Sequence, residues 1–546
     1  MNKRALAYLL IFFLAWAYIS FFTQGIPLHS AELWLHTFNS LDKNLDDFLR
    51  IGTYKFDIET RPLSYLRYQA LISFTGFNAF AFHLTENIPF AIFIALILYL
   101  TYKFTGNFTA GLGAALFYMI NPVTYMACGP NTLNLDLFVQ LCLLIITLIF
   151  LELYLHPERY RNYAGFWQAI MLLLLFLSIK TKAPGRLMPF VVLLFLLIDN
   201  RRRVKEFSLF LILGFIIVVP VQSILHYLGL PISQAVSYNY LDEPEKIVRF
   251  LFFTDEYPSR YGPTLLGVIG WPIAILFFIS LIFNLKYKNR LQAIYINTSE
   301  NQDKFREIKK VKLFLTVLFF CCVLGMVISP YTRSPYYLNG ILWPTVILIS
   351  ITLYQALLLA KQRKKQAIIG WILFITVTGM LCLNFLKVLT LRGGHVSYFI
   401  AQENIGKYFE KNIRQALILG DVELLTQSRL NLTNVEKWAP AGYNQEQLKK
   451  IAGHTLDSGN IFMVMENYSN IDGLTLEDLK QYKKIYPGYS VYLVKRGELK
   501  IDPAIKTEFV TNIYPKTNTL YDYFKDKMQF IKIYSRHVYK IYKVVE

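Results

Sequence analysis

The chain of 546 residues contains only five cysteines. They are Cys128, Cys142, Cys321, Cys322 and Cys382, and nearly all of them lie inside apolar stretches. None lies in the C-terminal part of the chain, so neither a disulfide framework nor a zinc site is predicted there. We interpret the five as small buried apolar side chains.

Acidic residues are also scarce relative to basic ones. Asp and Glu total 37 against 56 Lys and Arg, which gives a formal net charge of +19. Such a charge attracts nucleic acids, but here the Lys and Arg residues are scattered over short loops, which make a poor groove for a polynucleotide. We therefore expect no nucleic-acid partner. The chain also lacks internal repeats and low-complexity segments.

Apolar sequence, in contrast, is abundant. Hydrophobic residues make up 54% of the chain and aromatic residues 16%, and the mean hydropathy is +0.36. A soluble protein of this length could not hide so much apolar surface around one core. The apolar residues instead form blocks long enough to cross a hydrocarbon layer of about 30 Å, which takes about 20 residues. The approximate blocks are 5–22, 82–103, 108–127, 135–155, 164–179, 187–199, 207–228, 264–285, 313–329, 336–360 and 366–390.

These blocks predict an all-α polytopic membrane protein with about eleven transmembrane helices. The first block follows Lys3 and Arg4, as the apolar core of a signal peptide would. It is long for such a core and no small-residue cleavage site follows it, so we interpret it as an uncleaved first helix.

Lys and Arg are unevenly distributed between alternate loops. The segments 1–4, 156–162, 201–206, 286–312 and 361–365 are much richer in them than the loops between. Short cytoplasmic loops carry an excess of Lys and Arg, so we place the N-terminus in the cytoplasm and the C-terminal part outside. The protein is thus expected to be a multi-pass protein of the cytoplasmic (inner) membrane.

We divide the chain into two domains. Residues 1–391 form the predicted transmembrane domain, whose first external loop, at about 23–81, is long enough to contain short interfacial helices. Residues 392–546 are predicted to form an extracytoplasmic α/β domain, because strand patterns alternate with helix patterns. The strands are expected at 415–422, 461–465 and 489–494, and the helices at 445–451 and 476–482.

The first external loop contains six acidic residues, Glu32, Asp42, Asp46, Asp47, Asp57 and Glu59. If the stretch around Glu32 is helical, His29, Glu32 and His36 share one face, because residues three and four apart are neighbours on a helix. A carboxylate beside two imidazoles at a water–lipid boundary could act as a general base or hold a divalent cation. An amphipathic interfacial helix with a wet polar face is an equally good interpretation.

Several cations are predicted at the external ends of the spans, where the positive-inside bias disfavours them. They are Arg61, Lys180, Lys182, Arg186 and Arg333. The two N–H groups of an arginine guanidinium match two phosphate oxygens. A long side chain that only extends its charged group from the membrane to water explains the same position. Acids opposite cations at a lipid boundary suit the transfer of a group from a lipid phosphate to an acceptor.

A transporter could use the same charges. A transporter would have charged residues at mid-membrane positions and would consist of pseudo-symmetric halves. Here the apolar blocks are nearly free of charge. We therefore rank a lipid-linked glycan transporter or polymerase below an enzyme as an interpretation of the sequence.

Residues 61–87 (RPLSYLRYQALISFTGFNAFAFHLTEN) resemble membrane glycosyltransferases of the GT-C class. The resemblance is greatest to the branch that includes the O-mannosyltransferases with tetratricopeptide tails and their bacterial relatives. The stretch TGNFTAGLGAALFYMINPVTYMA is similar to that branch's third span, with Asn121 in place of a histidine. The stretch LFLSIKTKAPGRLMP is similar to a Leu-Ser-Lys-Glu segment, in which Lys180 or Lys182 matches the lysine and the glutamate is absent.

The resemblance implies an inverting enzyme that takes a sugar from a polyprenyl-phosphate donor on the outer face. The acceptor would be a cell-surface glycan, a lipid or a protein. An acidic residue of the first external loop would be the base, with Glu32 as first choice and Asp46 or Asp47 as second. The cations named above would hold the donor phosphate.

The chain departs from that family pattern in two further ways, of which the first favours an alternative. The family often carries a pair of acids where this chain has Ala31-Glu32, and the tetratricopeptide tail is replaced by the predicted α/β domain. The alternative is a non-catalytic relative that binds a glycan or lipid or acts as an assembly subunit.

Overall fold

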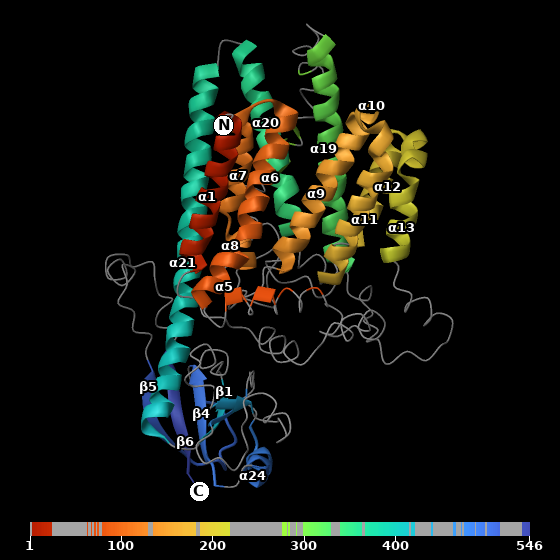
Figure 1. Ribbon diagram of the computed structural model, residues 1–546. Coiled ribbons are helices and arrows are strands. Elements are labelled where there is room, and N and C mark those ends of the chain that lie inside the picture. Colours follow the sequence, from red (N-terminus) through yellow and green to blue (C-terminus); the bar gives the residue numbers. More distant parts are fainter. Residues whose placement is uncertain are drawn as a thin grey trace.

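The protein is a bundle of helices with a sheet beyond one end (Figure 1). The computed structural model describes residues 3–23, 63, 67, 70–71, 74–75, 79–128, 135–181, 186–218, 276–280, 282–283, 291, 299–328, 339–362, 366–413, 416–420, 438–440, 462–465, 471, 474–485, 488–496, 499–513 and 538–545.

The helices of the bundle follow the apolar blocks of the sequence. They are α1 (Lys3–Thr23), α5 (Ala79–Glu86), α6 (Ile88–Thr105), α7 (Phe108–Met119), α8 (Pro122–Cys128), α9 (Leu135–Leu155), α10 (Pro157–Tyr160), η3 (Arg161–Tyr163), α11 (Ala164–Thr181), α12 (Met188–Asp199), η5 (Arg201–Phe207), α13 (Ser208–Val218), α19 (Ser299–Ile328), α20 (Asn339–Gln362) and α21 (Gln366–Asn412). The bundle buries one large apolar core, to which α6, α9 and α20 contribute many of the fully buried side chains, and a smaller cluster of Phe22, Tyr125 and Val388.

Six of the described helices are long and apolar enough to cross a membrane. Their apolar segments are Ala5–Thr23, Phe80–Thr105, Asp136–Leu155, Pro157–Ile179, Asn339–Lys361 and Gly370–Leu389, and two shorter apolar helices are Phe108–Met119 and Met188–Asp199. The apolar helices support the predicted membrane protein, whereas the predicted number of about eleven spans is not reached in the described part of the chain.

The predicted span 108–127 is two helices rather than one. The helix α7 ends at Met119 and α8 begins at Pro122, because a proline lacks the N–H needed to continue a helix. Asn121 is buried in this corner, and its Oδ1 accepts a hydrogen bond of 2.9 Å from the backbone N–H of Val123. The Thr124 hydroxyl donates to the carbonyl oxygen of Tyr118 at 2.7 Å, which closes the corner.

Gly106 ends α6 in the left-handed conformation, with φ +67°, and its N–H donates to the carbonyl oxygen of Tyr102 at 2.7 Å. A Cβ at this position would lie 2.2 Å from Nζ of Lys304. We expect Gly106→Ala to lower the free energy of unfolding by about 1–2 kcal/mol, the cost of left-handed backbone for an L-residue. Thermal unfolding in detergent measures the change.

Gly165 in α11 provides the matched control, because nothing lies within 4 Å of a Cβ built there. Alanine favours a helix over glycine, so Gly165→Ala should leave the unfolding temperature unchanged or raise it slightly. Equal shifts for the two variants would contradict the described end of α6.

The helix α21 is 47 residues long and passes from the bundle to the sheet (Figure 1). The predicted span 366–390 is its first part, and the predicted domain boundary at 391/392 falls inside it. Near its C-terminal end, Ala401, Ile405 and Phe409 are buried against the sheet. The ring of Phe409 lies 5.3 Å from that of Tyr492. One helix therefore joins the two parts of the molecule.

The C-terminal sheet has six strands in the order β2-β3-β1-β4-β6-β5. They are β1 (Ala416–Gly420), β2 (Trp438–Pro440), β3 (Phe462–Met465), β4 (Ser490–Arg496), β5 (Thr507–Ile513) and β6 (Tyr539–Val544). The strand β1 pairs in parallel with β3 and β4, and β2 pairs in parallel with β3. The strand β6 pairs antiparallel with β4 and β5. The sheet is thus mixed, with its parallel half formed by the first four strands.

The predicted strands at 415–422, 461–465 and 489–494 correspond to β1, β3 and β4. The predicted helix at 476–482 corresponds to α24 (Leu476–Ile485), and the one at 445–451 lies outside the described residues. The Thr475 hydroxyl and Asp478 cap α24 reciprocally, with Thr475 Oγ1 donating to Asp478 Oδ2 at 2.7 Å and accepting from the Asp478 N–H at 3.2 Å. These hydrogen bonds from Thr475 hold the pKa of the Asp478 carboxyl below its usual range.

Candidate functional site

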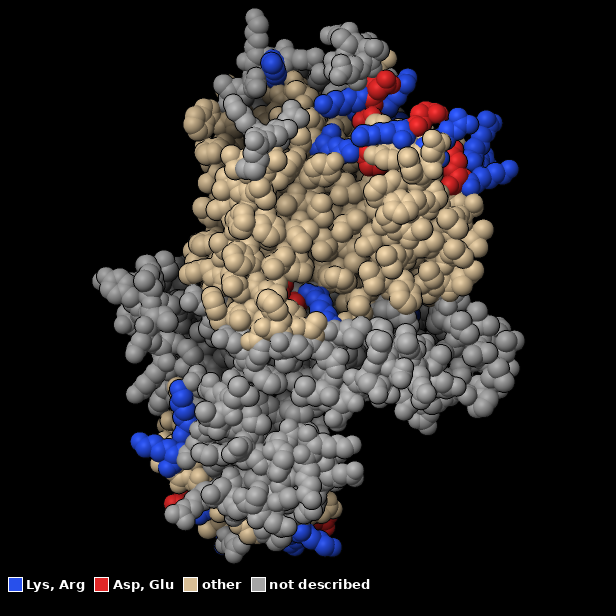
Figure 2. All heavy atoms as spheres, viewed as in Figure 1, with Lys and Arg blue, Asp and Glu red and all other residues tan. Residues whose placement is uncertain are grey.

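Buried polar side chains gather at the end of the bundle that faces the C-terminal sheet, where α5, α8 and α9 meet the start of α20 (Figure 1). Figure 2 shows basic and acidic atoms together at this edge, below a broad belt of the bundle surface without charged atoms. We use the name polar cluster for Arg67, His83, Glu86, Cys128, Asp136, Gln140 and Asn339.

The short helix α5 brings His83 and Glu86 to one face, because they are three residues apart, and both are buried. The corner between α5 and α6 is held by Asn87, whose Nδ2 donates to the hydroxyls of Thr23 at 3.0 Å and Ser20 at 3.3 Å. The indole Nε1 of Trp16 donates to the carbonyl oxygen of Leu84 at 2.8 Å. The end of α1 therefore fixes the direction in which α5 presents its acid.

Glu86 forms an ion pair with Arg67, and the two side chains are only 2% and 16% exposed. The Arg67 guanidinium also lies over the ring of Phe138 in α9, 4.9 Å from its centroid. Among the described residues, Nη1 of Arg67 is buried and has no hydrogen-bond partner. A buried donor on a charged group is costly to leave unfilled, so the guanidinium is suited to bind a further anion.

A second buried carboxylate shares a neighbour, Cys128, with the first. Asp136, in the first turn of α9, is buried. The Cys128 thiol at the end of α8 interacts electrostatically with the carboxylates of both Glu86 and Asp136. The corner at Asn121 thus places α8 so that one thiol lies near two acids that are 50 residues apart in sequence.

Amide side chains join α7, α9 and α20 at the same end. The Tyr118 hydroxyl donates to Oδ1 of Asn339 at 3.1 Å, and Tyr118 also interacts electrostatically with Cys128. Nδ2 of Asn339, like Nη1 of Arg67, is buried and has no hydrogen-bond partner in the described part of the chain. Oε1 of Gln140 accepts a hydrogen bond of 3.1 Å from Nε1 of Trp343. The polar cluster therefore offers donors as well as carboxylates.

Most of the site residues predicted from the sequence lie outside the described residues. These are His29, Glu32, His36, Asp46, Asp47, Arg61, Lys182 and Arg333. Lys180 lies in the last turn of α11, where only the backbone is described, and Arg186 is half-buried two residues before α12 begins. The predicted metal site at His29, Glu32 and His36 is among the undescribed residues. The described ranges contain no group of three or more side chains able to hold a metal ion.

Sequence reasoning missed Arg67, Glu86 and Asp136. Arg67 and Glu86 lie inside the run that resembles the GT-C class, and Asp136 is the second residue of an apolar block. An acid at the end of an apolar block is usually exposed to water, so its position alone did not single it out. The signal that could have found Glu86 is its spacing of three from His83.

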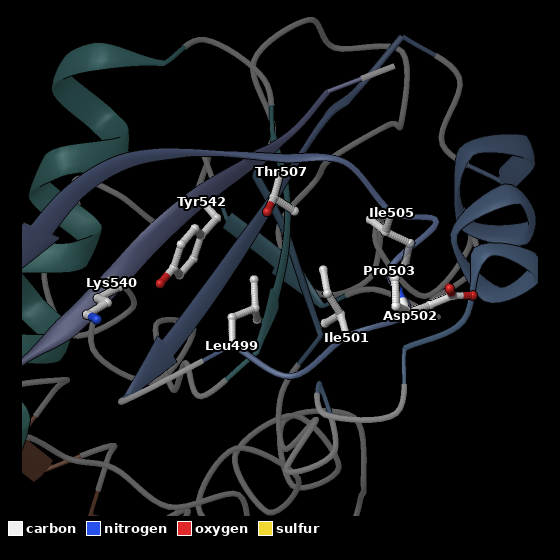
Figure 3. A pocket seen from close by; sticks show the side chains of 8 residues that line it. All are labelled: Leu499, Ile501, Asp502, Pro503, Ile505, Thr507, Lys540 and Tyr542. Carbon is white, nitrogen blue, oxygen red and sulfur yellow. The ribbon is translucent and has the colours of Figure 1, made fainter.

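A pocket of about 400 Å³ lies in the C-terminal domain, between the segment 499–507 and β6 (Figure 3). Its walls combine aliphatic residues with the polar Asp502 and Thr507, and Lys540 and Tyr542 reach it from alternate positions of β6. The carboxylate of Asp502 accepts hydrogen bonds from the backbone N–H groups of Ala504 at 2.9 Å and Leu476 at 3.4 Å. Because this acid serves as a structural cap, the pocket is suited to binding rather than to acid–base chemistry.

No protein-family model matches the chain, and no curated protein matches its sequence. Among solved structures, the chain is similar to the crystal structure of ArnT from Cupriavidus metallidurans bound to undecaprenyl phosphate. The two share 11% sequence identity at a TM-score of 0.48, and the match covers 99% of this chain and 98% of that one.

Proposed function

We propose that the protein is a membrane glycosyltransferase of the GT-C type, which transfers a sugar from a polyprenyl-phosphate donor to a glycan, lipid or protein acceptor on the outer face. The observation that carries the proposal is the Arg67 guanidinium, which has a buried donor without a partner among the described residues and pairs with Glu86 at one end of an apolar bundle. The resemblance of residues 61–87 to the GT-C class supports it, because this run contains both Arg67 and Glu86.

Arg67 is proposed to bind the donor phosphate. Charge-assisted hydrogen bonds from arginine to phosphate are among the strongest that side chains make. Glu86 holds one arm of the guanidinium, which orients the remaining donors. We further propose that Arg61, Lys180, Lys182, Arg186 and Arg333 supply additional positive charge around the same phosphate.

The reaction then needs one base and one leaving group. A carboxylate takes the proton of the acceptor hydroxyl, whose oxygen forms a bond to the anomeric carbon of the sugar. The bond from that carbon to the phosphate oxygen breaks, and its electron pair leaves with the polyprenyl phosphate, where Arg67 stabilises the charge. Attack opposite the leaving group inverts the anomeric centre. Asp136 is the described acid that we assign as the base, while Glu32, Asp46 and Asp47 of the first external loop are proposed as alternatives.

The proposed arrangement in the membrane follows the charge distribution. Residues 1–391 form a transmembrane domain of about eleven spans with the N-terminus in the cytoplasm, and residues 392–546 form an extracytoplasmic domain. The polar cluster then faces the outer side, as does the pocket beside Tyr542. We propose that this domain binds or orients the acceptor.

Donor binding tests the proposal through Arg67→Lys. Lysine keeps a positive charge opposite Glu86 but lacks the second arm of the guanidinium. We expect a short-chain polyprenyl phosphate to bind roughly tenfold or more weakly, which corresponds to the loss of one charge-assisted hydrogen bond. Binding is measured on the full chain in detergent, with Arg306→Lys as the control because Arg306 is exposed on α19.

Two results would count against this assignment. Unchanged affinity in Arg67→Lys would remove Arg67 from the donor site, and failure of the wild-type protein to bind any polyprenyl phosphate would remove the function itself. The non-catalytic alternative, which Ala31 favours, is distinguished by a third result, in which the donor binds tightly but no sugar is transferred to any acceptor.

A further inference from the structure

The end of the bundle opposite the polar cluster carries a concentration of cations (Figure 2). We use the name basic patch for the six exposed cations Arg159, Arg161, Arg201, Arg202, Lys205 and Lys309. They come from three segments, the α10–η3 turn, the helix η5 and the first part of α19.

Tyr154 at the end of α9 holds these three segments together. The Arg203 guanidinium of η5 lies 4.3 Å from the centre of its ring, and Nζ of Lys310 in α19 lies 4.9 Å from it. The Tyr154 hydroxyl donates a hydrogen bond to Asp199 at the end of α12. The α10–η3 turn begins three residues after Tyr154, so all three segments are anchored at one point.

The helix η5 is a 3₁₀-helix, in which side chains three residues apart lie directly above one another. Arg203 and Glu206 form one such row, with an ion pair of 2.6 Å. Arg202 and Lys205 form the neighbouring row, and both are exposed. Gln168 of α11 fixes the end of η5, since its Nε2 donates to the Glu206 carbonyl oxygen at 2.8 Å and its Oε1 accepts from the Phe210 N–H at 3.1 Å. Two cations are therefore presented side by side on an anchored element.

The acids around the basic patch are largely engaged with other cations. Glu206 pairs with Arg203, Asp199 with Lys310 and Asp303 with Arg306, and the Glu307 carboxylate lies 3.8 Å from Nε2 of His156. Among the described residues, the six cations of the basic patch make no ion pair. Glu158 is the one nearby described acid that also makes no ion pair. The patch thus carries positive charge that the protein itself does not balance.

Exposed apolar side chains adjoin the patch on two segments. Tyr163 and Phe166, which follow Arg161, are 64% and 62% exposed. Leu197 and Ile198, which precede Arg201, are also exposed. Aromatic residues concentrate at membrane–water interfaces, and apolar residues exposed on a membrane helix contact lipid. The cations therefore lie at the level of lipid head groups.

We propose that the basic patch binds the phosphate groups of anionic phospholipids in the leaflet that it faces, with Arg202 and Lys205 together holding one phosphate. Positive charge alone would be enough to orient the chain in the membrane. Orientation does not require two cations in one row on an anchored helix beside exposed apolar side chains. This arrangement on η5 fits a lipid phosphate. The inference does not depend on the function proposed for the opposite end.

The double variant Arg202→Gln with Lys205→Gln tests this inference on the full chain in a neutral detergent. We expect dioctanoyl phosphatidylglycerol to raise the unfolding temperature of the wild-type protein and to bind the double variant about 30-fold more weakly, because each cation near an anionic lipid surface contributes about fivefold in affinity. Lys480→Gln with Lys484→Gln, on exposed positions of α24, is the matched control and should bind like wild type.

Three results would overturn the inference. They are equal affinity of the double variant and wild type, equal binding of dioctanoyl phosphatidylcholine, and an equal shift of the unfolding temperature with inorganic phosphate alone, which would indicate an anion site unrelated to lipid. If the double variant does not fold, Arg159→Gln with Arg161→Gln removes two cations of the same patch outside η5. Its affinity should fall by a similar factor, and unchanged affinity would equally overturn the inference.

Discussion

Replacing Asp136 with asparagine is expected to lower the turnover number of sugar transfer by about 10²- to 10⁴-fold, the usual contribution of a general base. Asparagine has nearly the same size, so the packing of the buried side chain at the start of α9 is kept. It cannot accept the proton of the acceptor hydroxyl. The measurement is transfer of sugar by the purified full chain, with donor affinity determined on the same sample.

Glu86→Gln is the matched comparison, because Glu86 is the other carboxylate near Cys128. Its loss removes the partner of Arg67, so we expect weaker donor binding rather than a defect confined to turnover. Full activity in Asp136→Asn together with loss in Glu32→Gln would move the base to the first external loop. Full activity in all three variants would contradict a carboxylate base among them.

The second large effect is expected in the C-terminal sheet. Gly420 ends β1 with φ +132°, and a Cβ there would lie 2.0 Å from the carbonyl oxygen of Val494 and 2.8 Å from Cδ1 of Ile471. The oxygen belongs to β4, which pairs with β1 through Gly420 itself, so the backbone cannot yield without breaking the pairing. We expect Gly420→Ala to destabilise this domain by at least about 3 kcal/mol, from backbone strain and overpacking together.

Gly488→Ala separates strain from overpacking. Gly488 also has a positive φ, +82°, but nothing lies within 4 Å of a Cβ built there. Its replacement should cost only about 1–2 kcal/mol. Limited proteolysis of the full chain measures the difference in stability between the two variants. We expect rapid cleavage in the part of the chain that follows residue 412 for Gly420→Ala and not for Gly488→Ala. Similar proteolysis of both variants would contradict the described pairing of β1 with β4.

Long apolar runs made the membrane helices predictable, whereas the apolar pattern did not predict the break between α7 and α8. The block 108–127 has a uniform apolar composition, and hydropathy averages over the Asn121–Pro122 step. The break depends on the buried Oδ1 of Asn121, which caps α8 through Val123. Hydropathy registers a membrane span but not a local hydrogen bond that replaces a helical one.

The strands of the C-terminal sheet also differ in how well the sequence predicted them. β1 is a continuous apolar run and buried throughout, so its pattern was sufficient. β5 and β6 contain charged and polar residues, including Lys540 and Lys543, because one of their faces is only partly covered. Their antiparallel pairing across a long connection leaves little trace in the local sequence.

The polar cluster could be predicted only in part. The sequence singled out the region 61–87 by its resemblance to the GT-C class, but Arg67 and Glu86 become partners because α1, through Thr23 and Ser20, fixes the corner at Asn87. Asp136 joins them only when α8 turns at Asn121. Contacts between distant segments decide which charges are buried together, and no local pattern encodes them.

Mass spectrometry of the lipids that co-purify with the full chain tests the central claim most directly, with wild type and Asp136→Asn compared after extraction in mild detergent. The account predicts a bound polyprenyl-phosphate sugar, in at least equal amount in Asp136→Asn, because that variant keeps Arg67 but cannot complete the transfer. Its mass would also identify the sugar. Recovery of bulk phospholipid alone from both proteins would contradict the account.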